Sequence, residues 1–165
     1  MAIERSEAGD ALSDLALKVF RVNGRFLAAA DEISEGSGLT AARWQVLGAV
    51  LRGPLSVADV GRAMGLTRQS VQRLADVLVA EGICEYLDNP AHRRAKLLAP
   101  TAKGRAAIAE VHPIQAEWTS RVGDAVGVAA LRDAVATLDA ILAVLDSPHG
   151  KVKPDGVAPR ARKRG

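Results

Sequence analysis

The chain has 165 residues, of which 48% are apolar and only 3% aromatic, and this composition predicts one ordinary, mostly α-helical domain. Its formal charge of +3 does not by itself indicate a nucleic-acid partner: six Lys/Arg and one Asp lie beyond Ser147, so this tail carries +5 and the rest sums to −2. A single cysteine excludes an internal disulfide. Without a signal-peptide pattern or a run of roughly 18 apolar residues, we expect a soluble cytoplasmic protein with no membrane partner.

Two helices are predicted in the first third of the chain. Residues 11–36 carry apolar side chains at steps of three and four, which is typical of a long amphipathic helix. Thr40 then occupies the position of a helix N-cap, and Leu39 and Trp44 are spaced as a hydrophobic staple across it. The second helix should run from there to Leu51 and end before a Gly-Pro pair.

A short helix, a glycine corner and a longer helix are predicted next. Ser56 and Asp59 form a variant capping box that begins a helix of about two turns, and Gly65 ends it. Thr67 caps the following helix, in which apolar residues recur at helical spacing up to Gly82.

The rest of the chain predicts a hairpin, two more helices and a tail. Residues 83–88 and 95–99 are strand-like runs separated by an Asn-Pro turn. Thr101 caps a fifth helix, in which Pro113 removes a backbone donor and is expected to bend the axis, and a sixth helix follows. The tail at 148–165 is basic and rich in Pro and Gly, so we expect it to be disordered.

The order of these elements is that of a winged helix-turn-helix, in which a short helix, a corner, a polar helix and a basic-tipped hairpin follow one another. The predicted fold class is therefore mostly α (α+β), with about six helices and a two-stranded β-wing. The polar helix carries its spare side chains in its first two turns, the end that enters the DNA major groove. The candidate DNA-contacting residues are Thr67, Arg68, Gln69, Ser70, Gln72 and Arg73 on this helix and Arg93, Arg94 and Lys96 on the hairpin.

The chemistry of this set suits duplex DNA. Arg can bond guanine O6 and N7 in parallel, Gln can pair with adenine N6 and N7, and the two hydroxyls suit phosphates. Arg93 and Arg94 stand where a wing tip reaches the narrow minor groove, with Lys96 nearby for phosphate. A solvated helix face is the alternative for any one of these residues, but seven Lys/Arg against four acids over 67–105 and the neighbouring elements favour DNA.

These segments resemble the MarR family of transcription regulators over most of residues 10–146. The resemblance is carried by 39–51, by 56–82, by Asp-Asn-Pro-Ala-His-Arg-Arg-Ala-Lys at 88–96 and by Thr-Ala-Lys-Gly-Arg at 101–105. Arg94 matches the wing arginine that family members use on DNA, and the polar residues at 68–72 occupy recognition-helix positions. The sequence departs from the family at His92, where Asp is usual, and at Pro100, which replaces Leu.

The resemblance implies a homodimer on a near-palindromic operator, which agrees with three long apolar stripes that one small domain cannot cover. The implied organisation is a MarR-like domain at 10–147, comprising a DNA-binding winged helix at about 39–100 and dimerisation helices at about 10–36 and 101–147.

Family members are commonly released from DNA by a small aromatic acid or phenol, and repression is their commoner effect. Trp44 and His112 are candidates to line such an effector site in this chain. A core position for Trp44 and a surface position for His112 are the plainer interpretations.

Other functions have less support in the sequence. No G-x-S-x-G, P-loop or dinucleotide-binding glycine pattern occurs, so we expect neither an enzyme nor a cofactor. The three histidines lack metal-ligand spacing, and Cys84 has the character of a small core residue, so we expect no metal site. A winged-helix module for protein interaction or RNA binding stays open as the alternative, because fold alone does not fix function. The Arg/Gln-rich start of the polar helix is evidence against it, since an interaction module would more often present apolar groups there.

Overall fold

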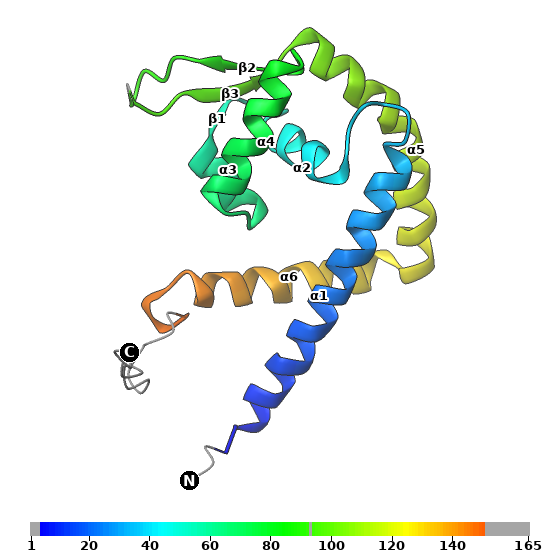
Figure 1. Cartoon of the computed structure of the whole chain (residues 1–165). Helices are drawn as coiled ribbons and strands as arrows, with labels where there is room; N and C mark the ends of the chain where they lie inside the picture. Colours follow the sequence, from blue (N-terminus) through cyan, green and yellow to red (C-terminus); the bar gives the residue numbers. More distant parts are fainter. Residues whose placement is uncertain (1–3, 93, 151–165) are drawn as a thin grey trace, which may run out of the picture. The chain divides into compact units, whose positions relative to one another are not determined.

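The computed structural model describes residues 4–92 and 94–150 (Figure 1). Its elements are α1 (Glu7–Ile33), α2 (Ala41–Ala49), β1 (Leu55–Ser56), α3 (Val57–Met64), α4 (Arg68–Ala80), β2 (Cys84–Leu87), β3 (Leu97–Pro100), α5 (Ala102–Val126), α6 (Val128–Leu145) and a 3-10 turn at Pro148–Gly150. The chain divides into two compact units within α5, between Glu117 and Trp118. The predicted winged helix-turn-helix class is confirmed, while most of the predicted tail, from position 151 onward, lies outside the described residues.

The helix α1 begins four residues before the predicted start at position 11. Ser6 is its N-cap, because the Ser6 hydroxyl oxygen accepts a hydrogen bond from the Gly9 amide at 3.1 Å. The apolar stripe does not extend into this polar first turn, so periodicity alone placed the start too late. The helix ends at Ile33, where the Ser34 amide bonds back to the Ala30 carbonyl.

The helix α2 confirms the predicted cap and ends two residues before the predicted Leu51. The Thr40 hydroxyl oxygen accepts from the Arg43 amide, and the Asp31 carboxylate accepts from the Ala41 amide at 2.6 Å, which ties α1 to the start of α2. At the other end, the amides of Val50 and Leu51 bond to carbonyls three residues back, so the last turn is tightened beyond the α-helix.

The helix α3 begins with the predicted capping box in altered form. The Asp59 amide donates to the Ser56 hydroxyl oxygen at 3.2 Å. The Asp59 carboxylate accepts from the Ser56 hydroxyl and from Arg62, whereas a full capping box would use the Ser56 amide. The hydrogen bond from Ser56, with a smaller contribution from Arg62, lowers the pKa of the Asp59 carboxyl below its ordinary value.

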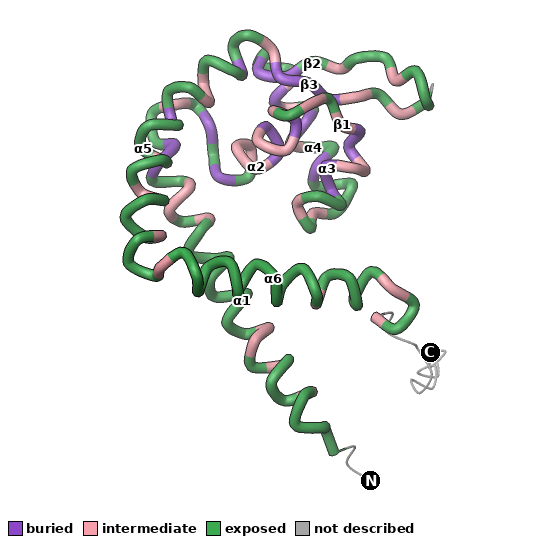
Figure 2. The backbone as a smooth tube through the Cα atoms, turned by 180° about the vertical axis from the view of Figure 1, so that it is seen from behind, coloured by how far each residue is buried: buried purple, intermediate pink, exposed green. Residues whose placement is uncertain are grey.

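The core of the first unit lies between α2, α3, α4 and the sheet (Figure 2). Its fully buried side chains are mostly aliphatic and include Val46, Leu47, Val60, Val71, Leu78 and Leu98. Cys84 belongs to the same cluster, as the sequence predicts, and burial raises the pKa of its thiol to about 11. The apolar face of α4 is therefore held inward, which turns its polar face toward solvent.

The sheet has three antiparallel strands in the order β1-β3-β2. The predicted hairpin forms its β2-β3 part, in which Tyr86 lies opposite Leu98. The additional strand β1 pairs Leu55 with Leu98 and Ser56 with Leu97. Two residues are too few to show a period of two, so the sequence prediction of a two-stranded wing missed this strand.

The start of α5 is docked tightly on the end of α4. The Thr101 hydroxyl accepts from the Gly104 amide, which confirms the predicted cap, and donates to the carbonyls of Gly82 and Ile83. A Cβ on Gly104 would lie 2.2 Å from the Ile83 carbonyl oxygen. Only glycine fits so close to the Ile83 carbonyl. Further along, α5 continues through Pro113 as one helix.

We expect Gly104→Ala to lower the free energy of unfolding by about 1–3 kcal/mol or more, because the new methyl group would push α5 away from the Ile83 carbonyl. Urea denaturation followed by circular dichroism measures the change. Gly48→Ala is the matched control: Gly48 lies in α2 with open space around its Cβ position, so this change should be neutral or stabilising. Equal stability of the two variants would refute the close-approach argument.

Much of α1 and α6 is exposed in the single chain (Figure 2), and the exposed residues include large apolar ones. On α1, Phe20 is 72% exposed and Phe26 is 55% exposed. In the second unit, Gly127 with φ 92° is the N-cap that precedes α6, whose residues Val128 and Val135 are more than half exposed. No helix in the described ranges is long and apolar enough to span a membrane.

Candidate nucleic-acid interface

The corner between α3 and α4 depends on two glycines. Gly65 ends α3 in the left-handed conformation, with φ 64°. The Leu66 amide donates to the Gly61 carbonyl at 2.9 Å, and a Cβ on Gly61 would lie 2.8 Å from the Leu66 carbonyl oxygen. This close approach fixes the direction in which α4 leaves the corner.

The first two turns of α4 present the predicted polar side chains to solvent. Val71 and Ala75 are buried and Leu74 packs against the core, so the remaining side chains of these two turns point outward. The exposed set is Arg68, Gln69, Ser70, Gln72 and Arg73, as the sequence predicts. Arg68 and Gln72 are four residues apart and form one ridge, while Gln69 and Arg73 form the next.

The two hydroxyls at the start of α4 are bonded to each other. Thr67 accepts from the Ser70 amide at 3.1 Å and donates to the Ser70 hydroxyl oxygen at 2.9 Å. The Thr67 hydroxyl is thus occupied by capping, whereas the Ser70 proton has no acceptor among the described residues and can be donated to a phosphate. The helix N-terminus adds its own unpaired amides and positive dipole end there.

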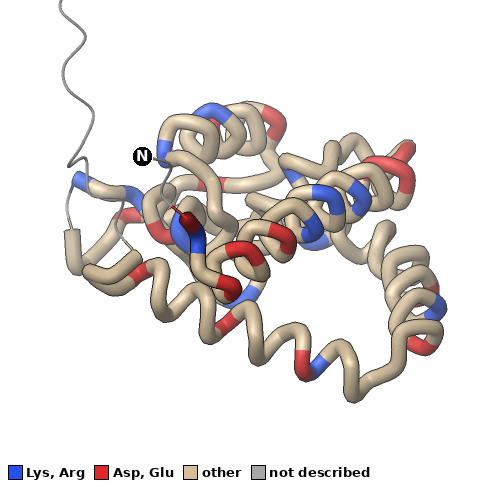
Figure 3. Tube along the Cα trace, turned by 90° about the horizontal axis from the view of Figure 1, so that it is seen from below, with Lys and Arg blue, Asp and Glu red and all other residues tan. Residues whose placement is uncertain are grey.

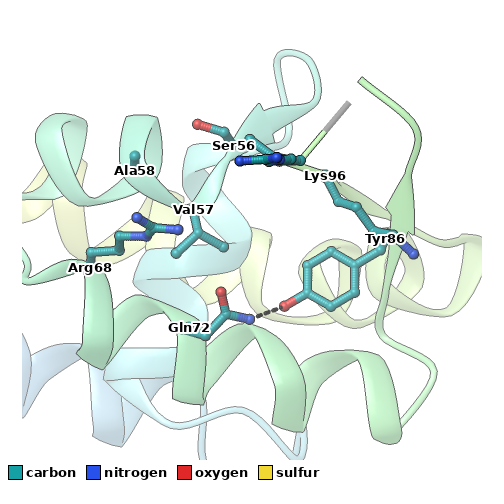
Figure 4. A pocket seen from close by; sticks show the side chains of 9 residues that line it. Ser56, Val57, Ala58, Arg68, Gln72, Tyr86 and Lys96 are labelled. Atoms are coloured by element: carbon teal, nitrogen blue, oxygen red, sulfur yellow. Dashed lines mark hydrogen bonds between the residues drawn. The ribbon is translucent and has the colours of Figure 1, made fainter. Parts of the chain in front are cut away.

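A pocket of about 380 Å³ lies between the starts of α3 and α4 and the wing (Figure 4). It is lined by Ser56, Val57, Ala58, Arg68, Gln72, Tyr86, Arg94, Ala95 and Lys96. The helix-turn-helix and the hairpin therefore bring three predicted cations, Arg68, Arg94 and Lys96, to one hollow. None of the three is in an ion pair within the described ranges. Such a hollow suits an anionic backbone.

A hydrogen-bonded triangle connects α4 to the wing. Gln72 Nε2 donates to the Tyr86 hydroxyl at 2.8 Å and to Asp76 Oδ1 at 2.9 Å, and the Tyr86 hydroxyl donates to Asp76 Oδ1 at 2.8 Å. Burial, followed by the hydrogen bond and charge of Asp76, raises the pKa of Tyr86 to about 12. Asp76 and Tyr86 were not predicted as site residues from the sequence, in which the only available signal was the four-residue spacing of Gln72 and Asp76.

The far end of α4 is fixed by an ion pair with α2 and by a hydrogen bond from α5. The two terminal guanidinium nitrogens of Arg43 contact the Glu81 carboxylate, at 3.0 and 3.1 Å. Lys103 Nζ donates to the Glu81 carbonyl at 2.8 Å, where it also complements the helix dipole. The polar face of α4 is thereby held at both ends.

The wing turn is closed by backbone hydrogen bonds at His92. The His92 amide donates to the Asn89 carbonyl, and the Ala95 amide donates to the His92 carbonyl. Arg94 is exposed, and the structure pairs it with no carboxylate among the described residues, in keeping with His92 at the position where Asp would be usual. The predicted contact residue Arg93 lies outside the described residues.

The two candidate effector residues occupy different environments. Trp44 is half-buried and packs against the core of the winged domain. His112 is exposed on α5. Both positions match the plainer interpretations of the sequence and leave their effector role a prediction.

Basic and acidic residues are interspersed over the chain (Figure 3), so overall charge does not define the interface. Its basic character is local to the pocket formed by α3, α4 and the wing. Among the described residues, no group of three or more His, Cys, Asp or Glu side chains could hold a metal ion.

The sequence is similar to a known family and to several bacterial proteins. Residues 37–95, which hold the helix-turn-helix and most of the wing, match the family model of the MarR family. An uncharacterised protein of Mycobacterium tuberculosis is 36% identical over 123 residues, which cover 74% of this chain and 86% of that protein. The transcriptional activatory protein BadR of Rhodopseudomonas palustris is 29% identical over 119 residues, which cover 68% of this chain and 66% of BadR.

Solved structures share the fold. The structure of Bordetella bronchiseptica BpsR, whose DNA binding is regulated by 6-hydroxynicotinic acid, matches with a TM-score of 0.66 and 26% identity. The match covers 78% of this chain and 98% of BpsR.

Proposed function

The chain belongs to the MarR family of DNA-binding transcription regulators, and from this premise we propose that it binds a near-palindromic operator in the cytoplasm as a homodimer. The observation that carries the proposal is the polar, solvent-facing start of α4 beside a cationic pocket shared with the wing. The α4 side chains would contact base edges in the major groove. Arg94 and Lys96, with Arg93, would contact the minor groove and the backbone.

The homodimer follows from the uncovered apolar surfaces. Large side chains of α1, α5 and α6, such as Phe20, Ile114 and Val135, are more than half exposed in the single chain. Exposed patches of this kind mark an interface, and a two-fold axis would place two copies of α4 about one DNA turn apart.

A small aromatic acid or phenol is the proposed effector. The regulation of BpsR by 6-hydroxynicotinic acid supports this chemistry. Trp44 supplies a half-buried indole at the edge of the core, and His112 an imidazole on α5. We propose that the effector releases a repressor from DNA, because a dimer on a promoter excludes RNA polymerase from the same DNA. BadR is an activator, so a reporter assay with and without the protein tests the direction.

Selection of bound duplexes from a random DNA pool tests the main proposal. We expect a palindromic consensus, salt-dependent affinity and a sedimenting mass of about twice the 17.3 kDa chain. RNA of the same sequences and an unrelated acidic protein serve as competitors. Equal capture of RNA or of the acidic protein would instead support an interaction module.

Removal of the basic tail should weaken binding to every duplex alike. The tail from 151 to 165 carries six Lys/Arg and one Asp, so it attracts phosphates without discriminating sequence. A chain that ends at Gly150 should show a flatter dependence of log K on log salt and an unchanged consensus. A changed consensus with constant non-specific affinity would show that the tail contacts bases.

A further inference from the structure

The side chains of Gln72, Asp76 and Tyr86 form a closed hydrogen-bonded triangle at the DNA-facing pocket, and we infer that Asp76 and Tyr86 hold Gln72 so that it offers DNA only its carbonyl oxygen. Figure 4 shows the side of this triangle that joins Gln72 to the Tyr86 hydroxyl. Gln72 would then select an amino group, that of adenine or cytosine. The inference rests on the proposed function, because it concerns how that surface discriminates between bases. Asp76 and Tyr86 are positioning residues that act through Gln72.

The hydrogen-bond partners determine which way the Gln72 amide is turned. A carboxylate oxygen only accepts, so the Gln72 atom 2.9 Å from Asp76 Oδ1 must be the nitrogen. The reversed amide would place its oxygen against the carboxylate and lose both donated bonds. The nitrogen carries two hydrogens, and the Tyr86 hydroxyl and Asp76 accept one each. No amide proton of Gln72 is left for a base.

Tyr86 is itself fixed by its place in the wing. It lies in the middle of β2, opposite Leu98, and its half-buried ring packs against the core. Its hydroxyl accepts from Gln72 and donates to Asp76, and the donated bond depends on the tyrosine proton. A pKa raised to about 12 keeps that proton in place throughout the neutral range.

The free atom of Gln72 is its carbonyl oxygen. No donor to this oxygen occurs among the described residues, and Figure 4 shows it turned away from Tyr86. In the major groove, adenine N6 and cytosine N4 are donors, whereas guanine O6 and thymine O4 are acceptors. The bidentate pairing with adenine N6 and N7 that the sequence alone predicts needs an amide proton that Gln72 lacks here. The triangle therefore changes the expected preference from adenine to adenine or cytosine.

Base-by-base affinities for the selected operator test the inference. Gln72→Ala identifies the contacted base pair as the one whose preference it flattens. There, the full-length parent should bind adenine and cytosine within about twofold of each other and at least roughly fivefold more tightly than guanine and thymine. Tyr86→Phe keeps the ring but frees one amide proton, so adenine should gain roughly fivefold over cytosine. Asp76→Ala frees the other proton and should shift the profile the same way.

The controls separate positioning from general damage. The double variant Gln72→Ala/Tyr86→Phe should have the profile of Gln72→Ala alone. Glu85→Gln, on the opposite face of β2, should change affinity uniformly and leave the profile intact. All variants should keep the parent's circular dichroism and mass.

Each remaining outcome has a distinct meaning. The inference is overturned if the parent prefers adenine alone, if Tyr86→Phe and Asp76→Ala leave the profile unchanged, or if Gln72→Ala alters no base pair. In these cases the selected operator still upholds DNA binding. A parent that selects no duplex at all would refute the proposed function itself.

Discussion

Replacing Arg68 by Ala should lower affinity for the selected operator about 5- to 150-fold, equivalent to about 1–3 kcal/mol. Arg68 is exposed at the first position of α4 and has no ion pair within the described ranges, so its guanidinium is available to DNA. Truncation removes both bonds of a bidentate contact with guanine at once. The loss should therefore relax preference at one base pair of each half-site, as measured by titration against singly substituted operators.

Two further substitutions make this expectation specific. Gln69→Ala should also relax preference at a base pair, because Gln69 lies on the neighbouring ridge of α4. Arg105→Ala removes the same kind of side chain from the start of α5, away from the pocket, and should leave the base profile unchanged. Folded, dimeric Arg68→Ala and Gln69→Ala proteins that bind as tightly as the parent would exclude α4 as the contacting helix.

The helix starts could be predicted wherever the cap is local. Four helices begin after a side-chain hydroxyl that accepts a hydrogen bond from the backbone amide three residues later, so the signal lies within one helical turn of sequence. These caps are Thr40, Ser56, Thr67 and Thr101. The start of α1 was predicted wrongly although Ser6 is also a local cap, because the apolar periodicity begins after it. Caps therefore placed helix starts better than periodicity did.

Strand pairing between distant parts of the chain was harder to predict from the sequence. The strand β1 exists only because its residues meet β3 more than 40 positions later, and two residues carry no pattern of their own. The departure at Pro100 is accommodated because it is the last residue of β3, where a missing amide removes no interior ladder bond.

The candidate interface likewise has features that depend on local sequence and features that depend on contacts between distant residues. Exposure of the polar residues on α4 follows from helical period and a buried opposite face, both visible in the sequence. The orientation of the Gln72 amide depends on Tyr86, which is 14 positions away on another element. The sequence could thus identify which side chains of α4 are exposed to solvent, whereas the hydrogen-bonding atoms that Gln72 leaves free could be identified only from the fold.

Arg94→Ala should weaken binding most on operators with A·T-rich flanks and leave the central base preference intact. Arg94 is exposed beside the wing turn and lines the cationic pocket together with Lys96. A narrow A·T-rich minor groove has an enhanced negative potential, so an inserted guanidinium gains most there. Titration of parent and variant against one operator core with A·T-rich or G·C-rich flanks measures the difference.

The matched comparison for this prediction is Lys96→Ala. Lys96 also lines the pocket, but as a phosphate contact its removal should weaken binding about equally on both kinds of flank and reduce the salt slope by about one. If Arg94→Ala instead weakens binding equally on both flanks, Arg94 neutralises a phosphate and does not recognise groove shape. If Arg94→Ala relaxes a central base pair, the wing contacts base edges, and the division of labour between α4 and the wing argued from the pocket geometry is wrong.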